Sequence, residues 1–126
     1  MILYTLGYKD WSFYDFLEKV EELGVVVIDV RFSPKGYSPF WSKSNLDKSL
    51  KSNYIHIPEL GNKNYNDLLK PIEVVDIEVG SRQVIGYLDL DFDCLLLCAC
   101  SDVDKCHRRV VSDFIQIKTR CEIIDL

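Results

Sequence analysis

The residues best suited to chemistry lie in one segment, CACSDVDKCHRR, which covers residues 98–109. The segment leads from an apolar run through an acidic turn into a helical pattern, and it places Cys106, His107 and Arg108 in succession. A thiol in the first turn of a helix feels the positive end of the helix dipole, and cationic neighbours strengthen that field. Both effects lower the thiol pKa toward the reactive thiolate. The segment therefore predicts a reactive cysteine at Cys106, with His107 as a second catalytic residue.

The same turn has two other interpretations. Free backbone N–H groups at a helix start, together with the Arg108 guanidinium, can donate charge-assisted hydrogen bonds to a phosphate or carboxylate. Alternatively the turn is structural, with Cys106 packed inward as a small apolar residue and Arg108 paired with Asp102 or Asp104. The sequence does not separate these interpretations.

Zinc is a further alternative, because Cys98, Cys100, Cys106 and His107 are all soft ligands. Cys98 and Cys100 share one face, since alternate residues of a strand point the same way. The spacing argues against a metal site, because Cys98 falls in the buried part of a strand and the Cys-x-x-Cys spacing of a zinc knuckle is missing. We therefore predict no metal site and an inert, buried Cys98.

Polar residues also follow two further apolar runs. Asp29 and Arg31 end one run, and His56 and Glu59 follow another. The carboxyl ends of parallel strands meet at one sheet edge, where ligands bind. We therefore predict one crevice in which Asp29, Arg31, Glu59 and Arg108 bind a ligand and His56 is a third catalytic residue. The structural alternatives are an Asp29–Arg31 ion pair that caps a strand and a hydrogen-bonded structural histidine.

An alternation of strand and helix patterns must position these residues. Runs that are apolar and β-branched throughout are typical of strands buried on both faces. Strands are predicted at 2–6, 25–30, 54–57, 94–99 and 121–124, and helices at 13–23, 44–50, 79–88 and 104–118. The last helix is expected to bury Val110, Val111, Phe114 and Ile117. The chain is predicted to form a single α/β domain over residues 1–126, with a Rossmann-like three-layer fold and a mostly parallel sheet.

Composition narrows the class of protein. The 126 residues are 48% hydrophobic, which suits one compact core. No run approaches the roughly 18 apolar residues of a membrane span, and the start lacks a signal-peptide pattern, so we expect a cytoplasmic protein. The five cysteines are an odd number and are expected to be reduced. A net charge of -5 argues against non-specific binding to nucleic acid, so any such contact is local.

Four motifs give the chain a family resemblance: YTLGY at 4–8, IDVRFSP at 28–34, YIHIPELGN at 54–62 and LLCACSDVDKCHRRVVSDFI at 96–115. With them the sequence resembles the family of domains of unknown function numbered 488, small proteins of bacteria, archaea and viruses. The resemblance implies a Rossmann-type α/β fold and a recurrent polar set that falls here on Asp29, Arg31, His56, Glu59, Cys98, Cys106, His107 and Arg108.

The chain departs from the family pattern at two positions. Cys100 stands where an acidic residue is usual, and Val103 stands where a proline is usual. The segment between Asn62 and Tyr87 is also shorter than in typical members, which implies a reduced covering loop. If the missing carboxylate serves catalysis, this chain lacks it.

Three functions fit these features. The first is an enzyme or degenerate enzyme acting on a nucleotide, a nucleic-acid end or another phosphorylated ligand; the residues do not identify its cofactor. The second is a module that binds such a ligand without turnover. The third is a protein-interaction adaptor that uses the aromatic residues Tyr37, Phe40 and Trp41, which could equally cover the core. Fold alone does not separate them.

Overall fold

One parallel sheet organises the chain. The computed structural model describes residues 1–34, 38–67 and 69–126. Its sheet has five strands in the order β3-β2-β4-β1-β5, and every neighbouring pair is parallel. The strands are β1 (Ile2–Gly7), β2 (Val26–Asp29), β3 (Tyr54–His56), β4 (Cys94–Cys98) and β5 (Glu122–Asp125). The predicted strands and the predicted α/β class are therefore confirmed.

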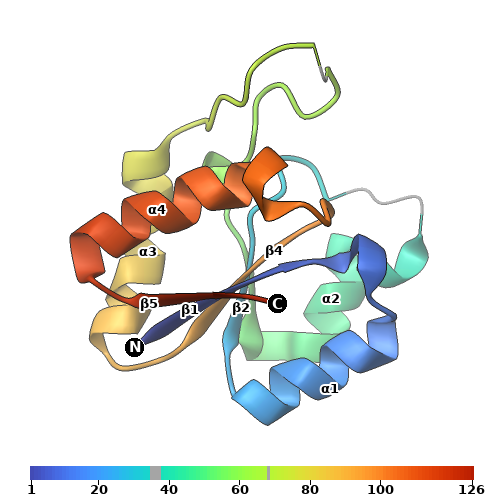
Figure 1. Cartoon of the computed structure of the whole chain (residues 1–126). Helices are drawn as coiled ribbons and strands as arrows, with labels where there is room; N and C mark the ends of the chain where they lie inside the picture. Colours follow the sequence, from blue (N-terminus) through green and yellow to red (C-terminus); the bar gives the residue numbers. More distant parts are fainter. Residues whose placement is uncertain (35–37, 68) are drawn as a thin grey trace.

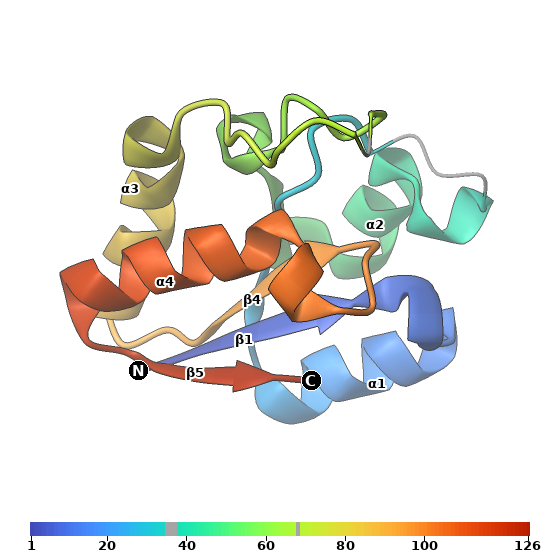
Figure 2. The same cartoon turned by 45° about the horizontal axis from the view of Figure 1, so that its top comes forward.

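Four α-helices cover the two faces of the sheet (Figures 1 and 2). They are α1 (Phe13–Leu23), α2 (Lys43–Leu50), α3 (Ile77–Asp89) and α4 (His107–Thr119), and short 3-10 turns lie at η1 (Tyr8–Asp10), η2 (Pro39–Trp41), η3 (Lys51–Asn53), η4 (Pro58–Leu60) and η5 (Val103–Lys105). One core cluster joins the sheet to α3 and α4, and a second joins it to α1 and α2. This is the three-layer arrangement that the alternating pattern predicted.

The limits of α1 follow from its sequence. The Ser12 side chain accepts a hydrogen bond from the Asp15 N–H at 3.1 Å, which satisfies one of the free donors at the helix start. The helix ends at Gly24, whose φ of 63° lies in the left-handed region that glycine adopts without strain.

The start and the buried face of α4 differ from the prediction. Asp104 belongs to the separate turn η5, where the Asp102 side chain accepts from the Asp104 N–H at 3.0 Å, and α4 begins only at His107. Val110 and Ile117 are exposed, whereas the inward face consists of His107, Arg108, Val111, Ser112 and Ile115. The prediction is confirmed for Val111 but was wrong for Val110 and Ile117, because polar residues occupy inward positions at the sheet edge and an apolar pattern does not reveal them.

The chain between β3 and α3 lies across the carboxyl edge of the sheet (Figure 2). The part between Asn62 and Ile72 is called the covering loop. The Asn62 side chain fixes its two ends, because Asn62 Oδ1 accepts hydrogen bonds from the backbone N–H groups of Asn64 at 3.1 Å and Glu73 at 2.9 Å. Within the described residues, no helix is both long and apolar enough to cross a membrane.

The turn between β4 and α4 rests directly on Gly7, the last residue of β1. A Cβ atom at Gly7 would lie 1.6 Å from the backbone oxygen of Cys100. Only glycine lets the two backbones approach so closely. Gly7 therefore fixes the position of the turn that carries Cys100.

We expect Gly7→Ala to lower the free energy of unfolding by about 1–3 kcal/mol, because the added methyl group must displace the Cys100 backbone. The matched control is Gly86→Ala in α3, where an added Cβ meets no atom within 4 Å. This control should raise stability by about 0.5–1 kcal/mol, the usual gain of alanine over glycine in a helix. Urea unfolding of both variants measures the difference, and equal effects would contradict the close contact.

Candidate functional site

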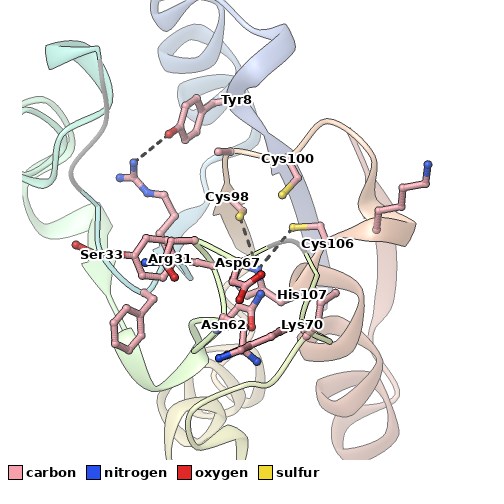
Figure 3. Close-up of a pocket in the computed structure, with 17 residues that line it drawn as sticks. Tyr8, Arg31, Ser33, Asn62, Asp67, Lys70, Cys98, Cys100, Cys106 and His107 are labelled. Carbon is pink, nitrogen blue, oxygen red and sulfur yellow. Dashed lines mark hydrogen bonds between the residues drawn. The ribbon is translucent and has the colours of Figure 1, made fainter.

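A cavity of about 580 Å³ opens at the carboxyl edge of the sheet (Figure 3). Its walls come from the residues that follow β1, β2 and β4, from the start of α4, and from the covering loop between Asn62 and Ile72. The strands β2, β4 and β1 are adjacent in the sheet, so the loops that follow them meet at one place. Of the predicted site residues, Arg31, Cys106 and His107 line this cavity.

A buried ion pair holds Arg31 in the cavity wall. The Asp29 carboxylate is fully buried and accepts from Arg31 Nε at 2.9 Å and Nη2 at 2.7 Å. Burial lowers the pKa of Arg31, but the hydrogen bonds and negative charge of Asp29 outweigh burial and raise that pKa above its ordinary value. The Tyr54 hydroxyl donates to the same carboxylate at 2.5 Å, and burial together with the Asp29 charge raises the pKa of Tyr54.

Aromatic side chains support the outer part of Arg31. Arg31 Nη1 donates to the Tyr8 hydroxyl at 3.3 Å, and its guanidinium carbon lies 5.3 Å from the centre of the Tyr8 ring. Tyr8 in turn stacks on Trp41, with 4.4 Å between ring centroids. A guanidinium has five N–H groups, and the contacts to Asp29 and Tyr8 engage three of them.

Both histidines of the chain hold the backbone beside Arg31. His107 Nε2 lies 2.7 Å from the Val30 carbonyl oxygen, and His56 Nε2 lies 2.7 Å from the Arg31 carbonyl oxygen. A carbonyl oxygen only accepts, so each Nε2 carries a proton and donates it. His56 is therefore close to the cavity but not part of its lining.

Three thiols converge on the side of the cavity formed by β4 and α4 (Figure 3). The sulfur atoms of Cys98, Cys100 and Cys106 all lie within 4.8 Å of one another. His107 Nδ1 lies 3.8 Å from Cys106 Sγ and 3.9 Å from Cys98 Sγ. Cys98 and Cys106 are buried at the cavity wall, whereas Cys100 is exposed.

The short distances between the three thiols and His107 shift their pKa values in different directions. Hydrogen bonds from Cys100 and Cys98 lower the pKa of Cys106 well below its ordinary value, and His107 adds to this effect against burial. A contact from Cys100 lowers the pKa of Cys98, but Cys106 and burial raise it to about 12. Cys106 and Cys98 also raise the pKa of Cys100. Burial lowers the pKa of His107, but the contact with Cys106 raises it overall.

Arg108 points away from the cavity. Its buried guanidinium donates from Nη1 to Thr5 Oγ1 at 2.9 Å and from Nη2 to the Cys100 carbonyl at 2.8 Å. Within the described part of the chain, its Nε has no hydrogen-bond partner. The side chain near Asp104 is that of Arg109, at 3.4 Å. Arg108 therefore joins β1 to the β4–α4 turn.

Glu59 is also outside the cavity lining. It lies half-buried in η4, where its backbone carbonyl accepts from the Asp76 N–H at 2.9 Å. Of the predicted residues, the cavity therefore brings together Arg31, Cys106 and His107. Asp29 and His56 do not line it but hydrogen-bond to Arg31. In the described part of the chain, Glu59 and Arg108 neither line it nor hydrogen-bond to Arg31.

Two parts of the cavity are not predictable from the sequence. Tyr65, Asp67 and Lys70 line it from the covering loop, which lacks a periodic pattern that could have placed it. Cys98 and Cys100 were expected to share a face, but their approach to Cys106 depends on the turn at 99–105, whose path the spacing does not give.

The fold and this cavity define a small Rossmann-like α/β protein with a polar site at the carboxyl edge of its sheet. The model of the family described as domain of unknown function DUF488 matches residues 12–71, in agreement with the resemblance seen in the sequence motifs. Asp29, Arg31, His56 and Glu59 fall within the matched residues, whereas the Cys98 to Arg108 segment lies outside them. No curated protein and no solved structure matches the chain.

The ion pair can be tested by a double-mutant cycle. We expect Asp29→Asn to lower the free energy of unfolding by about 3–5 kcal/mol, because it leaves the Arg31 charge buried without its partner. The double variant with Arg31→Gln should lose less than the sum of the single variants, with a coupling of about 1–3 kcal/mol. Asp47→Asn is the control, since the Lys43–Asp47 pair is exposed and should contribute less than about 1 kcal/mol. Additive single effects would contradict a coupled pair.

Proposed function

We propose that the protein binds a phosphorylated small molecule of the nucleotide class in the cavity at the carboxyl edge. The observation that carries this proposal is the placement of Arg31 in the cavity wall, with its guanidinium fixed from behind by the buried Asp29 carboxylate. A fixed guanidinium loses little conformational freedom when it binds an anion, and its planar fork suits phosphate oxygens.

The charge of the cavity supports an anionic ligand. Among the described residues, three cationic side chains line it, those of Arg31, Lys70 and Lys105, against one carboxylate, that of Asp67. Asp29 offsets the charge of Arg31, so Arg31 contributes directed hydrogen bonds. Asp102 lies 4.0 Å from Lys105 Nζ, so the positive charge of the wall rests on Lys70 and, in part, on Lys105, in a chain whose overall charge is -5.

An aromatic pair supports a ligand that carries a base. Phe32 and Tyr65 stack with ring centroids 5.5 Å apart, and both line the cavity while remaining 40% and 50% exposed. Bases stack on exposed aromatic rings, and each such contact contributes about 1–3 kcal/mol. This pair favours a nucleotide over inorganic phosphate.

Binding without turnover is the better supported of the two nucleotide hypotheses. His56 uses its Nε2 on the Arg31 carbonyl, and His107 uses its Nε2 on the Val30 carbonyl. Neither imidazole presents a free N–H group to the cavity in its neutral form. The contacts of both histidines are those of positioning residues.

The adaptor hypothesis receives less support. Trp41 is buried and stacks on Tyr8, so it belongs to the core and to the support of Arg31. Phe40 is half exposed and packs against Phe13. Tyr37, the third aromatic residue of that hypothesis, lies outside the described residues.

Calorimetric titration with adenosine monophosphate and inorganic phosphate, in the presence of a chelator, tests the charge argument. We expect wild type to bind the nucleotide with a Kd below about 1 mM, and Lys70→Gln/Lys105→Gln to weaken binding of both ligands at least about tenfold. The control Lys48→Gln/Lys118→Gln removes the same charge at two exposed lysines outside the cavity lining. No binding by wild type, or equal weakening by both double variants, would reject the proposal.

The aromatic pair predicts a selective effect. Tyr65→Leu should weaken nucleotide binding by about 1–3 kcal/mol, because the base loses its stacking surface, and should leave phosphate binding unchanged. Tyr14→Leu replaces an equally large side chain, 79% exposed on α1 and outside the cavity lining, and should change neither. The same titrations give the answer, and an equal loss for both ligands would argue against base stacking.

A further inference from the structure

The thiol cluster is a feature of the cavity that the proposed nucleotide site does not use. It consists of Cys98, Cys100 and Cys106, with His107 beside them. We propose that these four side chains bind a thiophilic divalent metal ion of the zinc class. The inference is independent of the nucleotide proposal, which rests on Arg31, the lysines and the aromatic pair.

The distances suit a tetrahedral centre. With Zn–S bonds of about 2.3 Å and a Zn–N bond of about 2.0 Å, tetrahedral geometry sets S···S separations near 3.8 Å and N···S separations near 3.6 Å. The observed separations are at most 4.8 Å between sulfur atoms, and 3.8 and 3.9 Å from His107 Nδ1 to the sulfurs of Cys106 and Cys98. Contraction by about 1 Å or less brings the three sulfurs to bonding distance of one ion, with His107 Nδ1 beside two of them as the fourth ligand.

The orientation of His107 is that of a metal ligand. Its Nε2–H donates to the Val30 carbonyl at 2.7 Å, which leaves the lone pair of Nδ1 directed at the sulfurs in the neutral ring. Histidines that bind metals characteristically donate their other ring N–H to a carbonyl or carboxylate, which fixes the tautomer and the ring plane. The bond to Val30 thus supplies the outer contact that such a ligand requires.

The other two cysteines lie outside the thiol cluster. Cys94 begins β4 at its amino end and Cys121 directly precedes β5, and neither is among the three sulfurs that lie within 4.8 Å of one another. Across the described ranges, the thiol cluster is the one group of three His, Cys, Asp or Glu side chains that converge closely enough to hold an ion. Cys100 is exposed and lines the cavity, so an ion can reach the cluster from solvent.

Binding exchanges protons for the metal and transfers no electrons. Each thiol that is protonated in the free protein releases its proton when its sulfur bonds the ion, and an imidazolium at His107 releases its Nδ1 proton before the neutral ring bonds through that atom. Three thiolates and one imidazole complete a four-coordinate set and leave no open position. The expected role of the ion is therefore structural: it joins the end of β4 to the start of α4.

The spacing of the cysteines along the chain does not exclude this site. Cys98 is buried, as predicted, but β4 ends at that residue and the following turn returns the chain so that Cys106 lies over it. A metal site depends on the spacing of ligands in space, and the seven residues between Cys98 and Cys106 do not prevent that approach.

Cobalt titration of the reduced, metal-free protein tests the proposal. We expect one equivalent of Co²⁺ to bind and to give the intense visible bands of a tetrahedral ion together with ultraviolet sulfur-to-cobalt charge-transfer bands. Zn²⁺ should displace the Co²⁺ and raise the Tm in a concentration-dependent way. Cys100→Ser should remove about one third of the charge-transfer intensity, because one of three thiolates is lost, and should weaken metal binding at least about tenfold.

Cys121→Ala is the matched control, because it removes one thiol outside the cluster and should leave the spectrum unchanged. Cys100 is exposed, so its serine variant should fold, and circular dichroism checks this. Cys106→Ser should give the same spectral loss as Cys100→Ser. A weak octahedral spectrum, an absence of charge-transfer bands, or equal behaviour of Cys100→Ser and Cys121→Ala would overturn the metal site. Neither lysine of the nucleotide test belongs to the cluster, so either proposal can fail alone.

Discussion

The buried carboxylate of Asp29 accepts hydrogen bonds from two nitrogens of Arg31 and from the Tyr54 hydroxyl. A fully buried carboxylate is strongly unfavourable unless its charge is compensated, so this pair fixes both side chains. The two histidines then hold the Val30 and Arg31 carbonyls, one from α4 and the other from β3. The path of the chain beyond β2 is thereby set by contacts from three elements, and the cavity takes its shape from that path.

A second arrangement, built around Gly7 and Arg108, sets the opposite wall. Gly7 lets the Cys100 backbone approach β1, and the Arg108 guanidinium bonds both Thr5 and the Cys100 carbonyl. Thr5 also links this arrangement to β5, because its hydroxyl donates a hydrogen bond to Asp125 of β5 at 2.6 Å. The Arg108 side chain, which the sequence predicts at a ligand, thus positions the turn that carries the thiols. Its influence on the cavity acts through Cys100.

The predictable and unpredictable parts of the structure differ for physical reasons. Strands β2 and β4 follow from continuous apolar runs, and α1 follows from its serine cap and its glycine end. His107 and Arg108 could be placed at the sheet edge but not oriented, because consecutive residues of a helix point about 100° apart. One therefore faces the cavity and the other faces β1. The covering loop was least predictable, since side-chain bonds such as those of Asn62 fix it without any periodic pattern.

The two proposals divide the cavity between its walls. Figure 3 places Arg31 and Tyr8 on one side and the sulfur atoms of Cys98, Cys100 and Cys106 on the other. A zinc ion bound by three thiolates and a neutral imidazole retains one net negative charge, so it repels an anion instead of attracting it. Phosphate must then bind on the side of Arg31, where Asp29 already orients the guanidinium and where Phe32 and Tyr65 present their rings. In this division the metal ion stabilises the wall formed by β4 and α4, and Arg31 on the opposite side binds the ligand.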